Sequence, residues 1–302
     1  MRTALSLLLL LAAAYWVITP ADTAPPELGV PTAPATKLTT QATGPIEYGY
    51  RPACQGDIDD PKTCDRWHLV GRDGRRWWLP RKTGESGPLA LSPDGTLAAY
   101  HTDDLVIRRL LDGKTTPVTP RISRSDGDTL LFSPDVRFLG ARSGKRLTIT
   151  DLTSGAQHRV KVGGDDVLHG WTAKGVVLTT TRPSDKIPGH LWATDLTEIG
   201  PDGTTLRRVP IPSNLADHLA ISPDGRTAAS AMSSGLALVD LTTGKATRSL
   251  AVPGLRSAVR WLGADRVLVR TTDGHLVVDV ATGTTHPRNA APDSLLVAEA
   301  LS

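Results

Sequence analysis

The strongest constraint on the fold is a set of glycines that recurs about every forty residues. The set is Gly74, Gly113, Gly155, Gly203, Gly244 and Gly283, separated by 39, 42, 48, 41 and 39 residues. Each glycine ends a tight turn between two short apolar runs of the kind that form β-strands. A period of about 40 residues with this content predicts a β-propeller, with one four-stranded blade per repeat. Because one repeat cannot bury its own apolar face, the blades are expected to pack against one another in a ring.

A first kind of turn is written Ser-Pro-Asp-Gly. Intact copies span Ser92–Gly95 and Ser222–Gly225, an altered copy spans Ser133–Val136, and diverged copies span Thr172–Gly175 and Leu262–Asp265. Proline presets φ, aspartate bonds its own backbone and glycine takes a positive φ. An apolar residue precedes each copy: Leu91, Phe132, Trp171, Ile221 or Trp261. These properties suffice to explain the motif, so we expect its Asp and Gly residues to form turns and not to bind ligands.

A second kind of turn lies within hairpins. Near copies occur at Asp151–Gly155, Asp240–Gly244 and Asp279–Gly283, shortened forms end at Gly74 and Gly113, and an expanded form spans Asp195–Gly203. The runs on either side are short and apolar, which suits strands buried on one or both faces of a blade.

Together the two turns resemble those of TolB-like and WD-repeat-like bacterial propellers, over about residues 46 to 300. The Trp-Asp pair that gives WD repeats their name is absent, so the TolB-like comparison is the closer one. The resemblance implies that the first turn joins strands one and two of a blade and the second joins strands three and four. It also implies a role in protein–protein binding without catalysis.

The blade count follows from the two kinds of turn. Six hairpins of the second kind but five turns of the first kind are present, so the first blade lacks its inner strands. Residues 294–299 and Ile46–Tyr50 are expected to supply them and to close the ring from both ends of the chain. We therefore predict an all-β fold with a six-bladed propeller over residues 46–302. Seven blades are the alternative if residues 46–65 contain further strands.

The N-terminus indicates export. Arg2 precedes an uncharged apolar run from Ala4 to Ile18, and Thr19 and Ala21 are small residues suited to cleavage after residue 21. Residues 1–21 are read as a signal peptide or as an uncleaved signal anchor that tethers the chain to a membrane. Either places the protein outside the cytoplasm, secreted or held on the outer side of the cytoplasmic membrane.

Residues 22–45 are rich in Pro, Ala and Thr and predict an extended linker, either a spacer from a membrane or a tail without a role. Cys54 and Cys64 follow it and are the two cysteines of the chain. In an exported protein they most simply form a disulfide. A zinc site is the weaker alternative, since it needs about four ligands and only His68 is near.

The candidate binding residues come from the irregular loops. In an antiparallel blade, turns 1–2 and 3–4 lie on one face, and loops 2–3 and the blade-to-blade connections lie on the other, where binding residues usually gather. The candidates assigned to this second face are His101, His169, His190, His218, His275, Asp128 and Asp217. A His/Asp rim around a channel suits a metal or a polar ligand. These residues come from different blades without metal-ligand spacing, so we expect neither a metal nor a cofactor.

Trp77 and Trp78 are adjacent in an expected strand, so at most one of them faces the core. An exposed Trp there would anchor a partner. Packing against the linker or the Cys54–Cys64 loop is the favoured alternative, since large aromatic side chains are mostly buried.

The charge distribution and the absence of catalytic motifs limit the possible functions. The 34 basic and 31 acidic residues are interspersed, with a net charge of +3, and form no basic stripe for nucleic acid. Gly-x-Ser-x-Gly, His-Glu-x-x-His and P-loop motifs are absent from the sequence, so no catalytic residue is assigned. We expect a monomeric, non-catalytic extracytoplasmic scaffold that binds a protein or a cell-envelope component. A sensor domain that works with another polypeptide fits equally well.

A secreted propeller enzyme, a glycan hydrolase or lyase, is the alternative function. It rests on the acidic, histidine-bearing loops. It would need two carboxylates within about 5–10 Å of each other in the central pocket.

Overall fold

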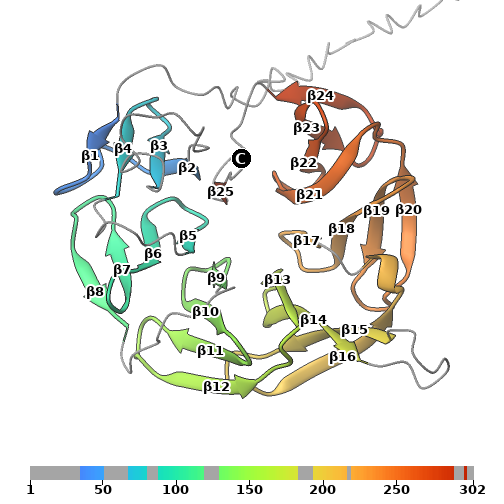
Figure 1. Ribbon diagram of the computed structural model, residues 1–302, viewed down its shortest axis with the longest axis horizontal. Helices are drawn as coiled ribbons and strands as arrows, with labels where there is room; N and C mark the ends of the chain where they lie inside the picture. The colour runs from blue at the N-terminus through green and yellow to red at the C-terminus, as the bar shows by residue number, and fades with distance from the viewer. Residues whose placement is uncertain are drawn as a thin grey trace, which may run out of the picture.

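The computed structural model describes residues 35–50, 67–79, 88–118, 129–182, 193–215, 219–288 and 296–297. Over these residues the chain forms six β-sheets arranged as a ring around a central axis (Figure 1). The helical content of the described residues is a single 3₁₀ turn, η1 (Ser213–Leu215). The prediction of an all-β, six-bladed propeller is therefore confirmed. The expected signal segment, the first part of the linker and the Cys54–Cys64 pair lie outside the described residues.

Blades two to six each contain four consecutive antiparallel strands. From the centre outward they are β5 (Leu89–Leu91), β6 (Leu97–His101), β7 (Leu105–Arg109) and β8 (Thr115–Pro117); β9 (Thr129–Phe132), β10 (Phe138–Ser143), β11 (Arg146–Asp151) and β12 (Gln157–Lys161); β13 (Val167–Trp171), β14 (Val176–Arg182), β15 (Ala193–Ile199) and β16 (Thr205–Ile211); β17 (Ala220–Ile221), β18 (Thr227–Met232), β19 (Gly235–Asp240) and β20 (Ala246–Leu250); and β21 (Leu255–Trp261), β22 (Arg266–Thr271), β23 (Gly274–Asp279) and β24 (Thr285–Arg288).

The first blade closes the ring with strands from both ends of the chain. Its order from the centre outward is β25 (Leu296–Val297), β2 (Ile46–Tyr50), β3 (His68–Gly71), β4 (Arg76–Trp78) and β1 (Thr36–Lys37). The C-terminal strand β25 pairs antiparallel with β2, which places Leu296 opposite Gly49. The expected closure from both termini is therefore confirmed.

The outermost strand of this blade, β1, comes from the range expected to be linker. It runs parallel to β4, and the following Leu38 donates its backbone N–H to Trp78 O at 2.9 Å. Leu38 is 1% exposed and packs with Trp77 in one apolar cluster, while Lys37 Nζ lies 5.6 Å from the centre of the Trp78 ring. Residues 36–38 thus extend the first blade and contact both tryptophans.

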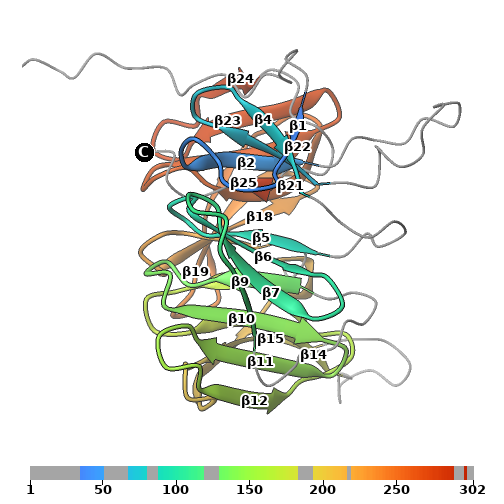
Figure 2. The same ribbon diagram turned by 90° about the vertical axis from the view of Figure 1, so that its left-hand side faces the viewer.

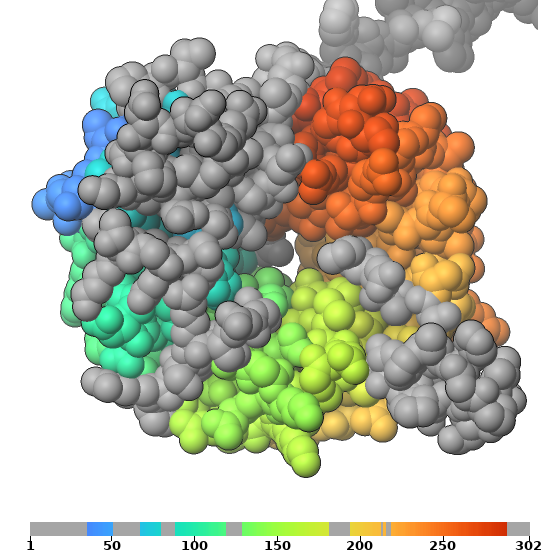
Figure 3. Space-filling model, viewed as in Figure 1, coloured from blue at the N-terminus to red at the C-terminus, as the bar shows by residue number. Residues whose placement is uncertain are grey.

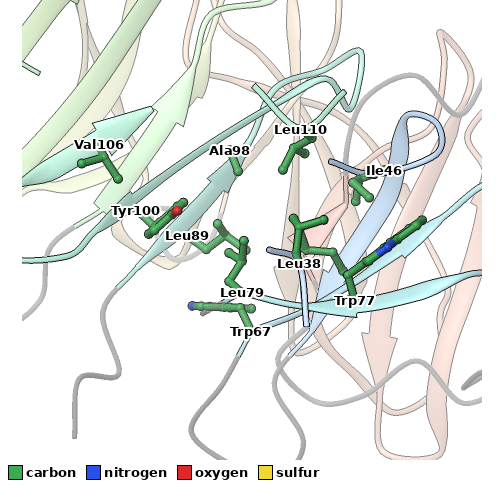
Figure 4. Packing of buried hydrophobic residues seen from close by; sticks show 12 residues of the cluster. Leu38, Ile46, Trp67, Trp77, Leu79, Leu89, Ala98, Tyr100, Val106 and Leu110 are labelled. Atoms are coloured by element: carbon green, nitrogen blue, oxygen red, sulfur yellow. The ribbon is translucent and has the colours of Figure 1, made fainter. Parts of the chain in front are cut away.

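The core consists of one apolar cluster at each of the six contacts between neighbouring blades. Figure 4 shows the contact of blades one and two, where Ile46, Trp77 and Leu79 meet Leu89 and Leu110. The smallest of these clusters closes the ring between blades six and one. Apolar side chains are thus buried between neighbouring blades, as a repeat that cannot bury its own apolar face requires.

Tryptophans that precede the first kind of turn also join blades by hydrogen bonds. The Trp171 indole N–H donates to Leu131 O of blade three at 3.1 Å, and Trp261 does the same to Ala220 O of blade five at 2.9 Å. Each ring therefore packs in the core and also satisfies a carbonyl of the neighbouring innermost strand.

The turns of the first kind repeat one hydrogen-bond pattern. In the copy at Ser92, the hydroxyl donates to Asp94 Oδ1 at 2.6 Å and accepts the Leu97 N–H at 2.8 Å. The altered copy keeps this pattern around Ser133, and Val136 holds the glycine conformation with φ of 60°. Val136 is the sole non-glycine residue with positive φ in the described part of the chain.

The propeller therefore has two distinct faces, which Figure 2 shows edge-on with the strands running between them. The turn face carries the turns between strands one and two and between strands three and four. The loop face carries the turns between strands two and three and the connections between blades.

Candidate functional site

The innermost strands of blades two to six surround a central cavity. Its volume is about 200 Å³. Figure 3 shows an opening at the middle of the ring. Apart from His169 and Arg260, the side chains of the described residues that line the cavity are apolar.

One position of the cavity wall can be compared across five blades, because each innermost strand ends at the residue before the first kind of turn. The next-to-last residue of each of these five strands lines the cavity. These residues are Ala90, Leu131, Gly170, Ala220 and Arg260. Four blades have a small or apolar residue there, and the sixth blade has a cation.

Arg260 lies beside a bulge in β21, where the register with β22 shifts between Ala258 and Arg260. Such a bulge redirects the side chains that follow it. The side chain is half-buried, and its Nε donates to Trp261 O at 3.2 Å. Burial lowers the pKa of the Arg260 guanidinium to about 10, so it stays a cation at neutral pH.

His169 occupies the equivalent bulge in β13, where the register shifts between Leu168 and Gly170. The Leu219 N–H donates to His169 Nδ1 at 3.1 Å, so the other nitrogen, Nε2, carries the proton and meets Thr179 Oγ1 at 2.8 Å. Both ring nitrogens are thereby engaged within the protein. His169 lines the cavity, but it joins blades four and five and does not present a nitrogen to a ligand.

The other two candidate histidines that the structure describes also lie in strands and not in loops. His101 ends β6 and His275 lies in β23; both are buried, and neither lines the cavity that His169 lines. The sequence predicted loops at His101 and His275 because both lie just outside the apolar runs, whereas strands β6 and β23 extend to include them. The remaining candidates, His190, His218, Asp128 and Asp217, lie outside the described residues. Within the described ranges, no group of three or more His, Cys, Asp or Glu side chains is arranged to hold a metal.

A second candidate site, missed by the sequence analysis, lies at the loop-face end of blade three. Its four cations, Lys145, Arg146, Arg159 and Lys161, are exposed and line a shallow hollow together with Val160. Lys145 stands in the turn between β10 and β11, Arg146 pairs with Lys161 in register, and Arg159 pairs with Thr148. We call these four residues the cationic cluster.

The cationic cluster has no evident role in folding. Like charges directly opposite on neighbouring strands are destabilising, and Arg146 and Lys161 are such a pair. No ion pair joins the four cations to a carboxylate of the described residues. The nearby Asp166 carboxylate is buried and accepts the Gly163 N–H at 2.6 Å. An exposed group of cations of this kind is suited to an anionic partner.

The cationic cluster is not recognisable in the linear sequence because it depends on the register of β11 with β12. Its members form two short groups, Lys145–Arg146 and Arg159–Lys161, separated by a hairpin. Only the pairing of β11 with β12 brings the groups together. A sequence-based signal exists once the hairpin turn at Asp151–Gly155 is recognised, because that turn fixes which residues pair.

Comparison with known proteins gives similarity of fold and no family. No protein-family model and no curated protein matches the chain. Among solved structures, Hsv2 of Kluyveromyces lactis has a TM-score of 0.49 at 15% identity, covering 76% of this chain and 72% of that one.

Dipeptidyl peptidase 4 of Porphyromonas gingivalis has a TM-score of 0.45 at 13% identity, covering 76% of this chain and 42% of that one. Hydrazine synthase of Kuenenia stuttgartiensis has a TM-score of 0.40 at 16% identity, covering 64% and 55%. This chain therefore spans less than two thirds of each of these two proteins.

Proposed function

We propose that this protein is a non-catalytic, extracytoplasmic binding propeller of the TolB-like kind, whose loop face binds a polyanionic component of the cell envelope. The cationic cluster is the observation that carries the proposal. The uncharged run from Ala4 to Ile18 supports an extracytoplasmic setting, as a cleaved signal or as a membrane tether. The two repeated turns support the TolB-like comparison.

The chemistry of the cluster suits phosphate or carboxylate groups that repeat along a polymer or a membrane surface. Arginine forks match such groups in pairs, and lysines act as point charges beside them. Near an anionic surface each cation contributes about 1 kcal/mol. Four cations therefore contribute about 4 kcal/mol, or about a thousandfold in affinity.

The alternative of a glycan hydrolase gains no support from the central cavity. Hydrolysis by paired acids needs two carboxylates about 5–10 Å apart. Among the described residues that line the cavity there is neither an Asp nor a Glu.

Two quadruple variants of the full chain test the proposal. The first changes Lys145, Arg146, Arg159 and Lys161 to Gln. The control changes Lys114, Arg226, Lys245 and Arg256 to Gln; these are exposed cations of blades two, five and six, so the net charge falls equally. Binding is measured to phosphatidylglycerol vesicles, to neutral phosphatidylcholine vesicles and to soluble polyphosphate. Comparing phosphatidylglycerol vesicles with polyphosphate distinguishes a lipid surface from a soluble polymer, and the neutral vesicles show whether the negative charge of the surface is needed.

The cluster variant is expected to lose about a thousandfold in affinity, the control only a few-fold, and wild-type binding should weaken as salt rises. Equal losses in the two variants, or wild-type binding to none of the anionic probes, would contradict the proposal. The extracytoplasmic location is tested separately by adding protease to spheroplasts. Digestion of the propeller while a cytoplasmic marker stays intact is the expected result.

A further inference from the structure

The outermost strand of each blade is an edge of its sheet, with backbone N–H and C=O groups that face away from the sheet (Figure 1). Such an edge can pair with a strand of another chain, and proteins protect it with proline, a bulge or a covering segment. In the described part of the propeller, the outer edges of five blades carry one of these protections. The exception is β12 of blade three, which holds two members of the cationic cluster.

The protected edges differ in the device they use. Proline stands in three of them, as Pro117 in β8, Pro210 in β16 and Pro287 in β24. A shift of register gives β20 an extra residue, Thr247, opposite β19, and such a bulge turns an edge away from a partner. In blade one, β1 of the same chain covers the edge of β4. Blade one therefore shows that an outer edge of this propeller can hold an additional strand.

Strand β12 has none of these devices. Its five residues pair with β11 in an unbroken register and include no proline. The Val162 N–H donates to Lys145 O at 3.0 Å, so the backbone groups of the even-numbered residues of β12 face β11. Those of Gln157, Arg159 and Lys161 therefore face outward. No strand of the described ranges pairs with this outer side.

The cations of the cluster determine which strand can be added. Arg146 and Lys161 are opposite each other, and Arg159 lies two residues before Lys161, so the three side chains share one face of the hairpin. A residue paired with Arg159 or Lys161 across a new strand places its side chain on the same face. A second copy of β12 would set cations opposite cations, which is destabilising. Carboxylates at alternate positions would each meet a cation.

We propose that β12 binds an extended acidic segment of another protein as a fifth, antiparallel strand of blade three. The segment carries Glu or Asp at every second position, on the face of Arg146, Arg159 and Lys161. Its backbone forms hydrogen bonds with the outward groups of β12, which supply affinity, and its carboxylates supply specificity. The inference rests on the function proposed above, because the same cations attract the partner, and it names that partner.

Two methylated forms of one peptide test the added strand. The peptide acetyl-Thr-Glu-Thr-Glu-Thr-Glu-Thr-amide carries N-methyl groups on its three glutamates or, as the matched control, on three of its threonines. In the proposed strand the glutamate N–H groups face β12 and the threonine N–H groups face away. The glutamate-methylated form is expected to bind the full chain about tenfold or more weakly than the control, although charge and composition are equal. Equal binding, or weaker binding of the control, would overturn the proposal.

Two variants of one residue locate the strand. Arg159→Pro and Arg159→Gln remove the same cation, but only proline also removes the outward N–H of residue 159. The proline variant is expected to bind the unmethylated peptide about fivefold or more weakly than the glutamine variant. Circular dichroism checks that both variants are folded. Equal peptide binding by the two folded variants would place the peptide elsewhere.

Soluble polyphosphate separates this inference from the function proposed above. Polyphosphate has no peptide backbone, so Arg159→Pro and Arg159→Gln are expected to bind it equally. Wild-type protein that binds polyphosphate, but binds the two methylated peptides equally, would retain the polyanion site and refute the added strand. Wild-type protein that binds neither polyphosphate nor the unmethylated peptide would contradict both proposals.

Discussion

The turn face and the loop face use charged side chains in opposite ways. On the turn face, Asp94 accepts hydrogen bonds from Ser92 Oγ and Thr96 N, and Asp240 accepts from the N–H groups of Thr242 and Thr243. On the loop face, the cationic cluster is exposed and places like charges opposite each other. The side chains that repeat from blade to blade are thus committed to folding. The four cations of the cationic cluster are exposed instead.

The largest stability effect is expected from Trp261, at the turn-face end of β21. Trp261→Ala removes a buried ring and should lower the free energy of unfolding by about 3–5 kcal/mol. Trp261→Phe keeps most of the ring and loses the bond to Ala220 O, at a cost of about 1 kcal/mol. Urea denaturation measures both. Equal effects would show that packing at this blade contact is not the main contribution.

Two copies of the second kind of turn, both on the turn face, are expected to differ in their tolerance of alanine. Gly113 and Gly155 have φ of 72° and 77°, so alanine is strained at either by about 1–2 kcal/mol. A Cβ at residue 113 would overlap Thr40 O, whereas nothing described lies within 4 Å at residue 155. Gly113→Ala should therefore cost about 1–3 kcal/mol more than Gly155→Ala. Equal costs, measured in urea, would mean that the segment around Thr40 is not docked on blade two.

Acid should weaken the turn face. Backbone N–H groups of Thr243 and Thr242 lower the pKa of Asp240, and the N–H of Thr282 lowers that of Asp279. Because these pKa values lie below the unfolded value of about 4, their stabilisation is present above that pH and is lost as pH falls through the folded pKa. Asp240→Asn should thus be less stable than wild type at neutral pH, and the difference should shrink as the pH falls below about 4. A difference that stays constant with pH, followed by urea midpoints, would contradict this.

The smallest effect is expected on the loop face. Lys145→Ala removes an exposed cation from a cluster of like charges and should change the free energy of unfolding by no more than about 0.5 kcal/mol. A loss above about 1 kcal/mol in the same urea assay would assign Lys145 to folding and would weaken the contrast between the faces.

Much of this fold could be predicted from the sequence, because turns are encoded locally. The Ser-Pro-Asp-Gly and Asp-x-x-x-Gly turns gave the blade number, the strand order and the closure by Ile46–Tyr50 with the C-terminus. Strand β1 was not predicted, because it has only two residues, too few to show an alternating pattern, and the composition around it is that of a linker. Its place depends on Leu38 covering Trp77, which is a long-range contact.

The sites were harder to foresee. The cationic cluster arises from the register of β11 with β12, and Arg260 becomes an exception only when innermost strands are aligned blade by blade. His169 was found in the sequence as a polar residue, but its two hydrogen bonds, which commit it to joining blades, depend on a bulge and on Leu219 fifty residues away.

Hydrogen–deuterium exchange of the full chain, with and without soluble polyphosphate, tests the central claim most directly. The account predicts slower exchange in the turn at Lys145–Arg146 and along Arg159–Lys161, with the turns at Ser92–Gly95 and Ser222–Gly225 unchanged. Polyphosphate binding that protects those turn-face segments and leaves the cationic cluster unprotected would contradict it.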